Sequence, residues 1–562
     1  MAQKKAKHRM VLSPQARTEL ETILGARYVT DDPALMSGYA WNTGVGKIPG
    51  GDKFVPIWPI AVVLPATTEE VAAVVKCCKR HGLSFRPHST GYGSMGCVTS
   101  PDSICIDLRR MNHLEVLPED RMAVIGPYAT ANQLQAEARK HGLTCHVVGA
   151  GPAHSPLASA TSLIGVGITS QFTSANMRNM LAWEWVTPEG EIIRGGSAAS
   201  GLGWYASDGP GPGTRGLLRG FFGGGGGLGV FTRIGIKLFP INQKGKMQTV
   251  GQVPQLRSPL PPNTALLHAI FPDYDAQRAA TFDLLQDDVC TVMLRMPPDH
   301  VGWTLTQSNA EFVRRTRDGT LPEPARQENG ASWTILIASR SAAEHQWRDE
   351  TVREIVTRHG GRFATMTAEE EGVLYHNLAT SQYVPRVLRA SGGITTSFGV
   401  LDSFHFLPKA VEMGEMMLAK DTAPGGDLCE GSPDEQWIWP HEGRYMWAEN
   451  IIHFDATSEA SRAAGARALI GHFAAQWKDP VGMTGLLVGP IQDITGPRIG
   501  KAPAFARKVK TYFDKDDRSK TKEHVIPNMP PLVEKILPAF RPVFSSALVL
   551  NVMSKMVGKN GT

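Results

Sequence analysis

The feature that most constrains this chain is a run of five successive glycines, residues 223–227, within GFFGGGGGLGVFTRIGI (residues 220–236). Ordering a glycine backbone loses more conformational entropy than ordering any other residue, so such a run is too costly for an ordinary turn. It stands directly before residues 228–238, a compact stretch of β-forming residues. We therefore expect a loop whose bare backbone approaches a ligand, at the start of a buried strand.

Two further glycine-rich segments precede it. RPHSTGYGSMG (residues 86–96) has a Gly-x-Gly-x-x-Gly spacing, and consecutive backbone N–H groups in such a loop can hold a pyrophosphate. The same spacing also occurs in simple tight turns. A Rossmann site is disfavoured because no helix follows the loop and no acid stands at the ribose position. GAGPAHSPLASATSLIGVG (residues 149–167) offers small residues and hydroxyls where a dinucleotide could approach closely.

A length of 562 residues predicts two or three domains. Residues 53–242 read as one α+β domain: a strand at 60–65, a capping box at 67–70 that begins a helix, a short strand at 83–85, and later strands up to 238. Residues 243–500 read as a second α+β domain with helices at 342–359 and 458–477. Residues 1–52 form an N-terminal arm, and residues 501–562 form a basic C-terminal segment with an apolar stretch.

Three glycine-rich loops in this order on an α+β domain resemble the FAD-binding domain of the vanillyl-alcohol oxidase/p-cresol methylhydroxylase (PCMH) superfamily, over roughly residues 55–240. The matching segments are IWPIAVVLPATTEEVAAVVKCCKRHGL, RPHSTGYGSMG, SPDSICIDLRRMNHLEV, EWVTPEGEIIRGG and GGGGGLGVFTRIGIKLFP. The resemblance implies an α+β fold in which a two-subdomain PCMH-type FAD-binding domain precedes an α+β substrate (cap) domain.

The resemblance also assigns cofactor residues. The first loop would cradle the FAD pyrophosphate, the second would line the ADP side, and the third would lie near the flavin. Many relatives with covalent flavin carry a histidine where this chain has Tyr92, so we expect FAD to be bound non-covalently. The predicted cofactor-binding residues are Pro87, Ser89, Thr90, Gly91, Tyr92, Gly93, Ser94 and Gly96, then Pro156, Thr161, Ser162, Gly165 and Gly167, then Gly229, Val230 and Thr232.

The second domain suggests a substrate class. YVPRVLRA (residues 383–390) and ITTSFGVLDSFHFLPKAVEM (residues 394–413) are similar to the C-terminal domain of flavin-linked D-2-hydroxy-acid (D-lactate/glycolate) dehydrogenases. That likeness makes Arg386 the candidate to grip a substrate carboxylate with two parallel hydrogen bonds. An arginine exposed at a helix end is the alternative for this residue. The histidine-rich metal motif of several such dehydrogenases is absent, and we predict no metal site.

Oxidation of an alcohol also needs a base, and histidine titrates in the appropriate range. His441, Arg444, Tyr445 and His453 are the candidates, with 441, 445 and 453 on one strand face and 444 on the other. Histidines that merely hydrogen-bond within a strand are the alternative. Tyr92, in a Gly-Tyr-Gly triplet, resembles the loop of para-phenol oxidising members, where the tyrosine helps to bind phenolate.

The most direct prediction is therefore an FAD-dependent dehydrogenase or oxidase that oxidises a small molecule, most readily a 2-hydroxy acid, by hydride transfer to flavin N5. A para-substituted phenol oxidase on the same scaffold is one alternative. A non-redox FAD-dependent transferase resembling alkylglycerone-phosphate synthase is another, and a flavoprotein scaffold subunit is a third. An oxidoreductase without its own iron–sulfur or haem motif would pass electrons to a partner protein, a quinone or oxygen.

Charge and cysteine usage bear on location and partners. Seven scattered cysteines, a charged first ten residues and no apolar run of about 18 residues predict a cytoplasmic protein. Both ends are basic while the rest of the chain is net acidic, which argues against a nucleic-acid groove. The apolar residues 543–557 suggest peripheral membrane contact or, alternatively, a helix that closes the protein's own core. We also expect a homo-oligomer.

Overall fold

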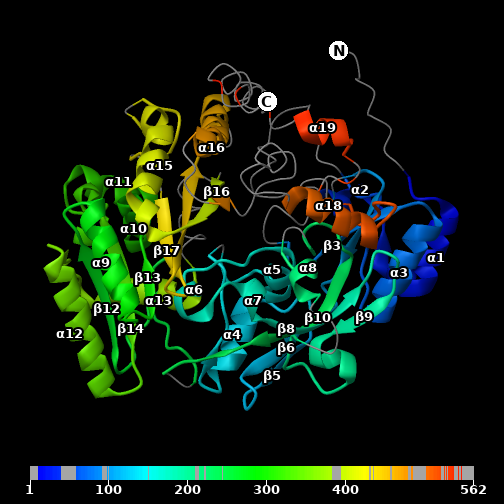
Figure 1. Ribbon diagram of the computed structural model, residues 1–562, viewed down its shortest axis with the longest axis horizontal. Helices are drawn as coiled ribbons and strands as arrows, with labels where there is room; N and C mark the ends of the chain where they lie inside the picture. Colours follow the sequence, from blue (N-terminus) through cyan, green and yellow to red (C-terminus); the bar gives the residue numbers. More distant parts are fainter. Residues whose placement is uncertain are drawn as a thin grey trace.

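The computed structural model describes residues 11–39, 58–91, 98, 100–149, 151–208, 214–220, 223–242, 245–382, 394–423, 425–429, 432–434, 436–455, 458–478, 483–484, 502–520, 525, 527, 529–536, 539, 542 and 546. The fold is α+β, as predicted. Two sheets with their helices make up one half of the molecule, on the right in Figure 1, and two further sheets make up the other half.

The first sheet has the strand order β1-β2-β4-β3, in which β2, β4 and β3 run parallel. Helix α3 follows β2, and its N-cap is Thr67, whose hydroxyl accepts from the Glu70 amide as the capping pattern predicts. Helices α1 and α3 share one apolar core with the sheet. The elements are α1 (Pro14–Leu24), β1 (Val29–Thr30), α2 (Pro33–Ser37), β2 (Ala61–Val63), α3 (Thr68–Arg80), β3 (Ser84–His88) and β4 (Ser103–Asp107).

The second sheet is antiparallel, with the order β5-β6-β10-β8-β9. Its central strand β10 follows the five-glycine run, as the sequence predicts, and its residues are almost all buried. The elements are β5 (Leu114–Leu117), β6 (Met122–Ile125), α4 (Ala131–Arg139), β7 (Leu143–Thr144), α5 (Pro156–Ser162), α6 (Ser170–Thr173), α7 (Asn176–Asn179), β8 (Met180–Val186), β9 (Ile192–Gly195), α8 (Arg215–Leu218), β10 (Val230–Lys237) and β11 (Phe239–Pro240).

The other half contains two four-stranded sheets, β13-β14-β12-β15 and β17-β18-β16-β19. Arg295 and Ile438 bridge them through two backbone hydrogen bonds of 2.8 and 3.0 Å. The buried Arg295 guanidinium is held by Asp434 at 2.5 Å, and Tyr274 accepts from it at 3.0 Å. The strands are β12 (Thr264–Ile270), β13 (Val292–Leu294), β14 (Ser332–Ala338), β15 (Arg362–Phe363), β16 (Ile394–Asp402), β17 (Gln436–His441), β18 (Tyr445–His453) and β19 (Met483–Thr484).

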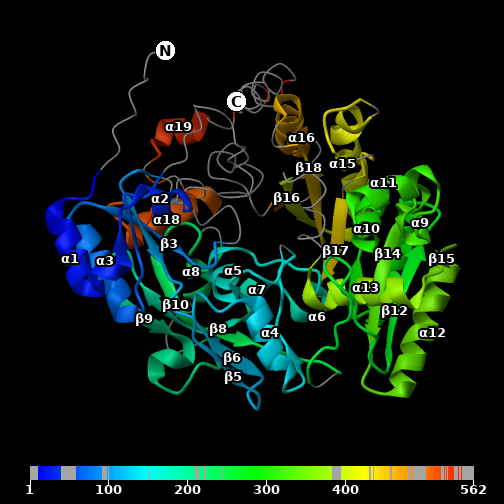
Figure 2. The same cartoon turned by 180° about the vertical axis from the view of Figure 1, so that it is seen from behind.

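Helices pack around these two sheets, as Figures 1 and 2 show from opposite sides. They are α9 (Tyr274–Gln286), α10 (Pro298–Leu305), α11 (Asn309–Arg317), α12 (Ala342–Arg358), α13 (Ala368–Thr380), α15 (Leu407–Thr422) and α16 (Glu459–Lys478). Helices α12 and α16 agree with the two amphipathic helices predicted for this half to within a residue at each end.

The C-terminal part of the chain returns to the first half. Helix α18 (Ala502–Phe513) lies beside the first two sheets in both ribbon views, while α19 (Pro531–Ile536) follows further out. Phe513 contacts Trp185 of β8 with ring centroids 5.4 Å apart. Residues 501–562, which we predict from sequence as a separate segment, thus supply a packed helix to the first half. The domain boundaries themselves stay a prediction.

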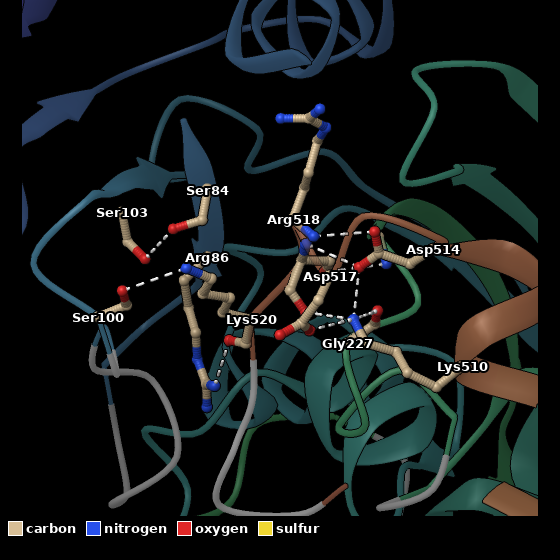
Figure 3. A network of polar contacts seen from close by, with 12 residues as sticks. Ser84, Arg86, Ser100, Ser103, Gly227, Lys510, Asp514, Asp517, Arg518 and Lys520 are labelled. Atoms are coloured by element: carbon tan, nitrogen blue, oxygen red, sulfur yellow. Dashed lines mark hydrogen bonds and ion pairs between the residues drawn. The ribbon is translucent and has the colours of Figure 1, made fainter. Parts of the chain in front are cut away.

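A buried lysine connects this C-terminal part to both sheets of the first half (Figure 3). Lys510 Nζ donates to Gly227 O at 2.8 Å and to Ser519 O at 2.7 Å, and it pairs with the Asp514 carboxylate at 2.5 Å. Ser519 in turn accepts from the Gly229 amide at 3.2 Å. The loop before β10 is therefore tied directly to residues 514–519.

The same segment extends the edge of the first sheet. The Phe85 amide of β3 donates to Arg518 O at 2.9 Å, and Ser519 forms a parallel bridge with Phe85. Arg86 donates to Lys520 O at 3.1 Å, and the Lys520 ammonium lies 2.8 Å from Asp102. We call residues 510–520 the C-terminal clasp, because they join β3 of the first sheet to the glycine-rich loop of the second.

Replacing Lys510 with Met should lower the free energy of unfolding by about 3–5 kcal/mol, because it leaves the buried Asp514 carboxylate without its cation. Urea denaturation of the purified protein measures this. Lys508→Met is the matched control, since Lys508 is exposed on the same helix, and it should change stability by no more than about 0.5 kcal/mol. Equal effects of the two substitutions would contradict a structural role for the clasp.

Candidate functional site

The second and third glycine-rich segments pack directly against each other. The Gly220 amide donates to Thr161 O at 2.8 Å. A Cβ on Gly224 would lie 2.6 Å from Thr161 O and 3.0 Å from the Ser162 hydroxyl, so only glycine fits there. The structure thus brings together two segments that are some sixty residues apart and that the sequence assigns to one cofactor.

The first glycine-rich loop reaches the same region through the C-terminal clasp. Strand β3 ends at His88, Ser89 and Thr90 are half-buried, and Gly91 is exposed with φ of 71°. Ser519 contacts β3 on one side and Gly229 on the other. The clasp therefore lies between the start of the first glycine-rich loop and the third glycine-rich segment. Tyr92, Gly93, Ser94 and Gly96 lie outside the described residues.

Several predicted cofactor glycines have a packing role within the protein. A Cβ would lie 2.5 Å from Asn176 Cβ at Gly165, 2.2 Å from Val147 O at Gly167, and 2.2 Å from Val186 O at Gly229. Gly165 and Gly229 also have φ of 69° and 92°, which favours glycine. The absence of side chains at these positions is explained by the fold, and their contact with a cofactor stays a prediction.

The remaining predicted cofactor residues divide into buried and accessible ones. Pro156, Thr161, Val230 and Thr232 are buried, and the Thr232 hydroxyl lies 3.1 Å from the Glu184 carboxylate. Six small residues of the three segments are half-buried: Pro87, Ser89, Thr90, Ser162, Gly224 and Gly225. Hydroxyls, backbone amides and close backbone approach suit a diphosphate-bearing cofactor, so these residues fit FAD.

A β-hairpin from the other half reaches the second glycine-rich segment. The turn between β17 and β18 places Glu442 and Gly443 at φ of 50° and 65°. The Glu442 amide donates to Ser170 O at 3.2 Å, and its carboxylate accepts from the Ser174 hydroxyl and pairs with Arg178. Burial acts to raise the pKa of Glu442, but the hydrogen bonds from Ser174 and Arg178 outweigh burial and lower the pKa. The hairpin tip is therefore held by a charged anchor.

His441 lies at the base of this tip, fully buried. Its ring stacks on that of Tyr445, its partner across the hairpin, with centroids 5.1 Å apart and an interplanar angle of 8°. Neither ring nitrogen has a hydrogen-bond partner among the described residues. Burial lowers the pKa of His441 to about 3, so the imidazole is neutral at pH 7.

Two more buried histidines lie in the facing segment. Burial lowers the pKa of His146 to about 3, assisted by the charges that His154 and His441 would carry, and it lowers the pKa of His154 to about 4. His146 Nδ1 lies 2.8 Å from the Thr173 hydroxyl, and His154 Nδ1 donates to Gly151 O at 2.7 Å. A Cβ on Gly149 would lie 3.5 Å from the Trp439 ring of the hairpin. Neutral imidazoles thus line the contact between the two halves.

The structure places two of the other predicted catalytic residues, Arg444 and His453. Arg444 is exposed in the hairpin turn. His453 is at the far end of β18, about 26 Å along the strand from Tyr445 at 3.3 Å per residue. Its ring packs on Trp303 and His300 of α10, with centroids 5.0 and 5.3 Å away. Arg386 and Tyr92 lie outside the described residues, so their roles stay predictions.

Sequence reasoning missed the anchor and the facing histidines. Glu442 and Gly443 directly follow His441, and an acid before glycine is a turn signal that could have placed His441 at a hairpin tip. His146 and His154 flank the Gly-Ala-Gly triplet at residues 149–151. No local pattern identifies Ser174 and Arg178 as partners of Glu442, because they are more than 260 residues away in the chain.

One group of potential metal ligands occurs among the described residues, far from these loops in the fold. Glu19 of α1 lies near Cys77 and His81 of α3. The Glu19 carboxylate already pairs with Arg80 and lies 2.8 Å from His81 Nε2. The hydrogen bonds from Arg80 and His81 lower the pKa of Glu19. These contacts account for the cluster without an ion.

Comparisons with known proteins agree with this geometry. Residues 59–196 match the family model described as an FAD-binding domain. The fold is similar to that of p-cresol methylhydroxylase, with a TM-score of 0.68 and 17% identity over 91% of this chain and 96% of that one. Residues 59–196, which include the first two glycine-rich segments, are thus an FAD-binding domain. The chain as a whole shares the fold of p-cresol methylhydroxylase.

Curated relatives match over shorter stretches. D-lactate dehydrogenase of Archaeoglobus fulgidus is 30% identical over 32% of this chain and 38% of its own length. A probable mitochondrial D-lactate dehydrogenase of Danio rerio is 27% identical over 44% of this chain and 48% of its own length. The chain therefore spans less than half of the curated relatives it matches here. Of the helices in the described part of the chain, none is long and apolar enough to cross a membrane.

The buried histidines predict a loss of stability in acid. In the unfolded chain His441 binds a proton below its ordinary pKa of 6.5, whereas the folded protein excludes that proton down to about pH 3. The free energy of unfolding should therefore fall as the pH drops below 6.5, by about 2 kcal/mol at pH 5 for His441 alone.

Urea denaturation at pH 7.5 and pH 5 measures this effect, and His441→Gln should reduce the difference between the two pH values by about that amount. His113→Gln, at a half-exposed histidine of the first half, is the control and should leave the difference as it is. An unchanged difference in His441→Gln would show that His441 is accessible to protons in the folded protein.

Proposed function

We propose that this protein oxidises a small 2-hydroxy acid with non-covalently bound FAD, and that His441 accepts the proton of the substrate hydroxyl. FAD, when bound, supplies the hydride acceptor at its N5 atom. The observation that carries the proposal is the buried, neutral His441, neither of whose ring nitrogens has a hydrogen-bond partner among the described residues, at the contact between the β17–β18 hairpin and the FAD-binding domain. The D-lactate dehydrogenase relatives support the substrate class.

The chain's own residues suit the role of His441. A base must be deprotonated when substrate arrives, and burial keeps this imidazole neutral at pH 7. Stacking on Tyr445 fixes the plane of the ring, and the Glu442–Arg178 anchor fixes the position of the hairpin. Our candidate for binding the substrate carboxylate is Arg386, on the strength of the sequence resemblance.

A para-substituted phenol is the second candidate substrate. The Gly-Tyr-Gly triplet around Tyr92 and the similarity of the fold to p-cresol methylhydroxylase favour it. A phenolate needs a hydrogen-bond donor at its oxygen. It does not need the base that a hydroxy acid requires, which is the role proposed for His441. The two candidates therefore differ in which substitution abolishes the reaction, Tyr92→Phe for the phenol and His441→Gln for the hydroxy acid.

Anaerobic titration of the holoprotein with D-lactate, glycolate and 4-alkylphenols, followed by the loss of flavin absorbance, tests the proposed function. We expect a hydroxy acid to reduce the flavin and His441→Gln to slow reduction about 10²–10⁴-fold, the contribution of a positioned base. The rate should be flat from pH 5 to pH 8, because the pKa of His441 lies near 3.

His405→Gln, at an exposed histidine of the other half, is the matched control. Substrate should reduce the flavin of this variant at the wild-type rate. Flavin reduction by phenols alone would favour a para-substituted phenol as the substrate. A bound flavin that no compound of either class reduces would contradict both and favour a transferase or scaffold role.

Acid precipitation of the holoprotein tests the cofactor linkage. Without a histidine at position 92, we expect the yellow colour to remain entirely in the supernatant and the pellet to be colourless. Reconstitution of the stripped protein with FAD should then restore the visible spectrum. A pellet that keeps its colour after washing would mean a covalent link from another residue.

A further inference from the structure

A cavity of about 90 Å³ lies between the FAD-binding domain and the second half, apart from the glycine-rich loops and the hairpin. One wall comes from α4, β7 and α6, and the other from β12, β13, β14 and α13. Its surface is largely apolar, built by side chains that include Phe172, Ile241, Val292, Leu336 and Leu378. None of the candidate catalytic or cofactor residues lines it.

One cation lines this apolar cavity. Arg139, the last residue of α4, is 8% exposed; its buried Nε has no hydrogen-bond partner among the described residues, none of which forms an ion pair with the guanidinium. Burial lowers its pKa, yet the pKa of an arginine is high enough for the charge to remain at pH 7. A buried charge is normally paired, because an unpaired one is strongly unfavourable.

The groups around Arg139 do not supply the missing anion. The titratable groups that act on it are the Tyr375 phenol and the Cys145 thiol. Burial raises the pKa of Cys145 to about 12 and also raises the pKa of Tyr375, so both are neutral at pH 7. Tyr375 is 6% exposed and also lines the cavity. A guanidinium and a phenol hydroxyl together offer several donors to one anionic group.

The walls are held firmly around this space. Gln135 donates to Ala379 O at 2.9 Å, and Ser381 donates to Val148 O at 3.1 Å, each bond joining α4 or its neighbouring segment to the end of α13. The Gly245 amide donates to Arg139 O at 2.8 Å and fixes the backbone of the arginine itself. The cavity is thus a formed site that needs little reorganisation to accept a ligand.

We propose that this cavity is a second binding site, for a small monocarboxylate whose carboxylate pairs with Arg139 and Tyr375 and whose short alkyl chain fills the apolar space. The volume limits the chain to a few carbons, because a cavity of about 150 Å³ is known to hold the six carbons of benzene and this one is smaller. Butanoate places only a three-carbon chain in the apolar space, with its carboxylate at Arg139. The site goes beyond the proposed oxidation, since butanoate has no hydroxyl to oxidise.

Isothermal titration of the holoprotein with butanoate tests the site. We expect saturable binding of one butanoate that leaves the flavin spectrum unchanged, and no binding of butanamide, which has the same shape without the charge. Arg139→Met should weaken butanoate binding at least tenfold, and Tyr375→Phe should weaken it severalfold. Lys140→Met is the matched control, since it removes the neighbouring cation, whose side chain is 60% exposed, and it should bind butanoate as the wild type does.

A second variant keeps the test independent of the charge. Ala379→Leu fills the cavity, leaves Arg139 in place, and should abolish binding. Arg139→Met should unfold at the wild-type temperature or above it, because it removes an unpaired buried charge. Binding that persists in Arg139→Met and Ala379→Leu, or that perturbs the flavin bands, would place butanoate at the flavin site and overturn the proposal. Absence of any butanoate binding would overturn it as well.

Discussion

The FAD-binding half depends on one buried ammonium group. Lys510 carries a full charge into the interior and is stable there because two carbonyls and the Asp514 carboxylate surround it. Those partners belong to the loop before β10 and to the clasp that extends β3. This cation therefore ties the glycine-rich loop before β10 to the segment that extends the first sheet.

The contact between the two halves follows the opposite electrostatic principle. Near the hairpin tip His441, His146 and His154 are buried as neutral rings, and the Glu442–Arg178 pair supplies an ionic contact at the tip itself. The anchor also holds Glu442 in a left-handed conformation that a non-glycine residue seldom adopts without compensation. The Glu442–Arg178 pair thus positions the hairpin, while the neighbouring imidazoles stay unprotonated, as the proposed base would have to be.

Local sequence signals were sufficient for several of the elements, and the resemblance to a known family indicated the class of cofactor. The Thr67 cap placed the start of α3, and the five-glycine run placed β10, since both follow from backbone chemistry within a few residues. The clasp could not be predicted in this way. Lys510 is one of many basic residues near the C-terminus, where charge patterning indicates a solvated surface, and its partner Gly227 is 283 residues away. The Glu442 anchor escaped prediction for the same reason.

Lys510, Arg295 and Arg139 are three buried cationic side chains whose surroundings differ. The difference indicates which of them stabilise the fold and which is suited to binding a ligand. Lys510 and Arg295 each have a carboxylate within 2.5 Å and join sheets to one another. Arg139 is buried nearly as deeply, yet it faces an apolar space and two neutral groups. Desolvating a guanidinium without a counter-charge reduces stability. A buried arginine without a counter-charge is expected where a bound ligand, and not the folded chain, supplies the anion. Positions under functional constraint commonly reduce stability in favour of activity.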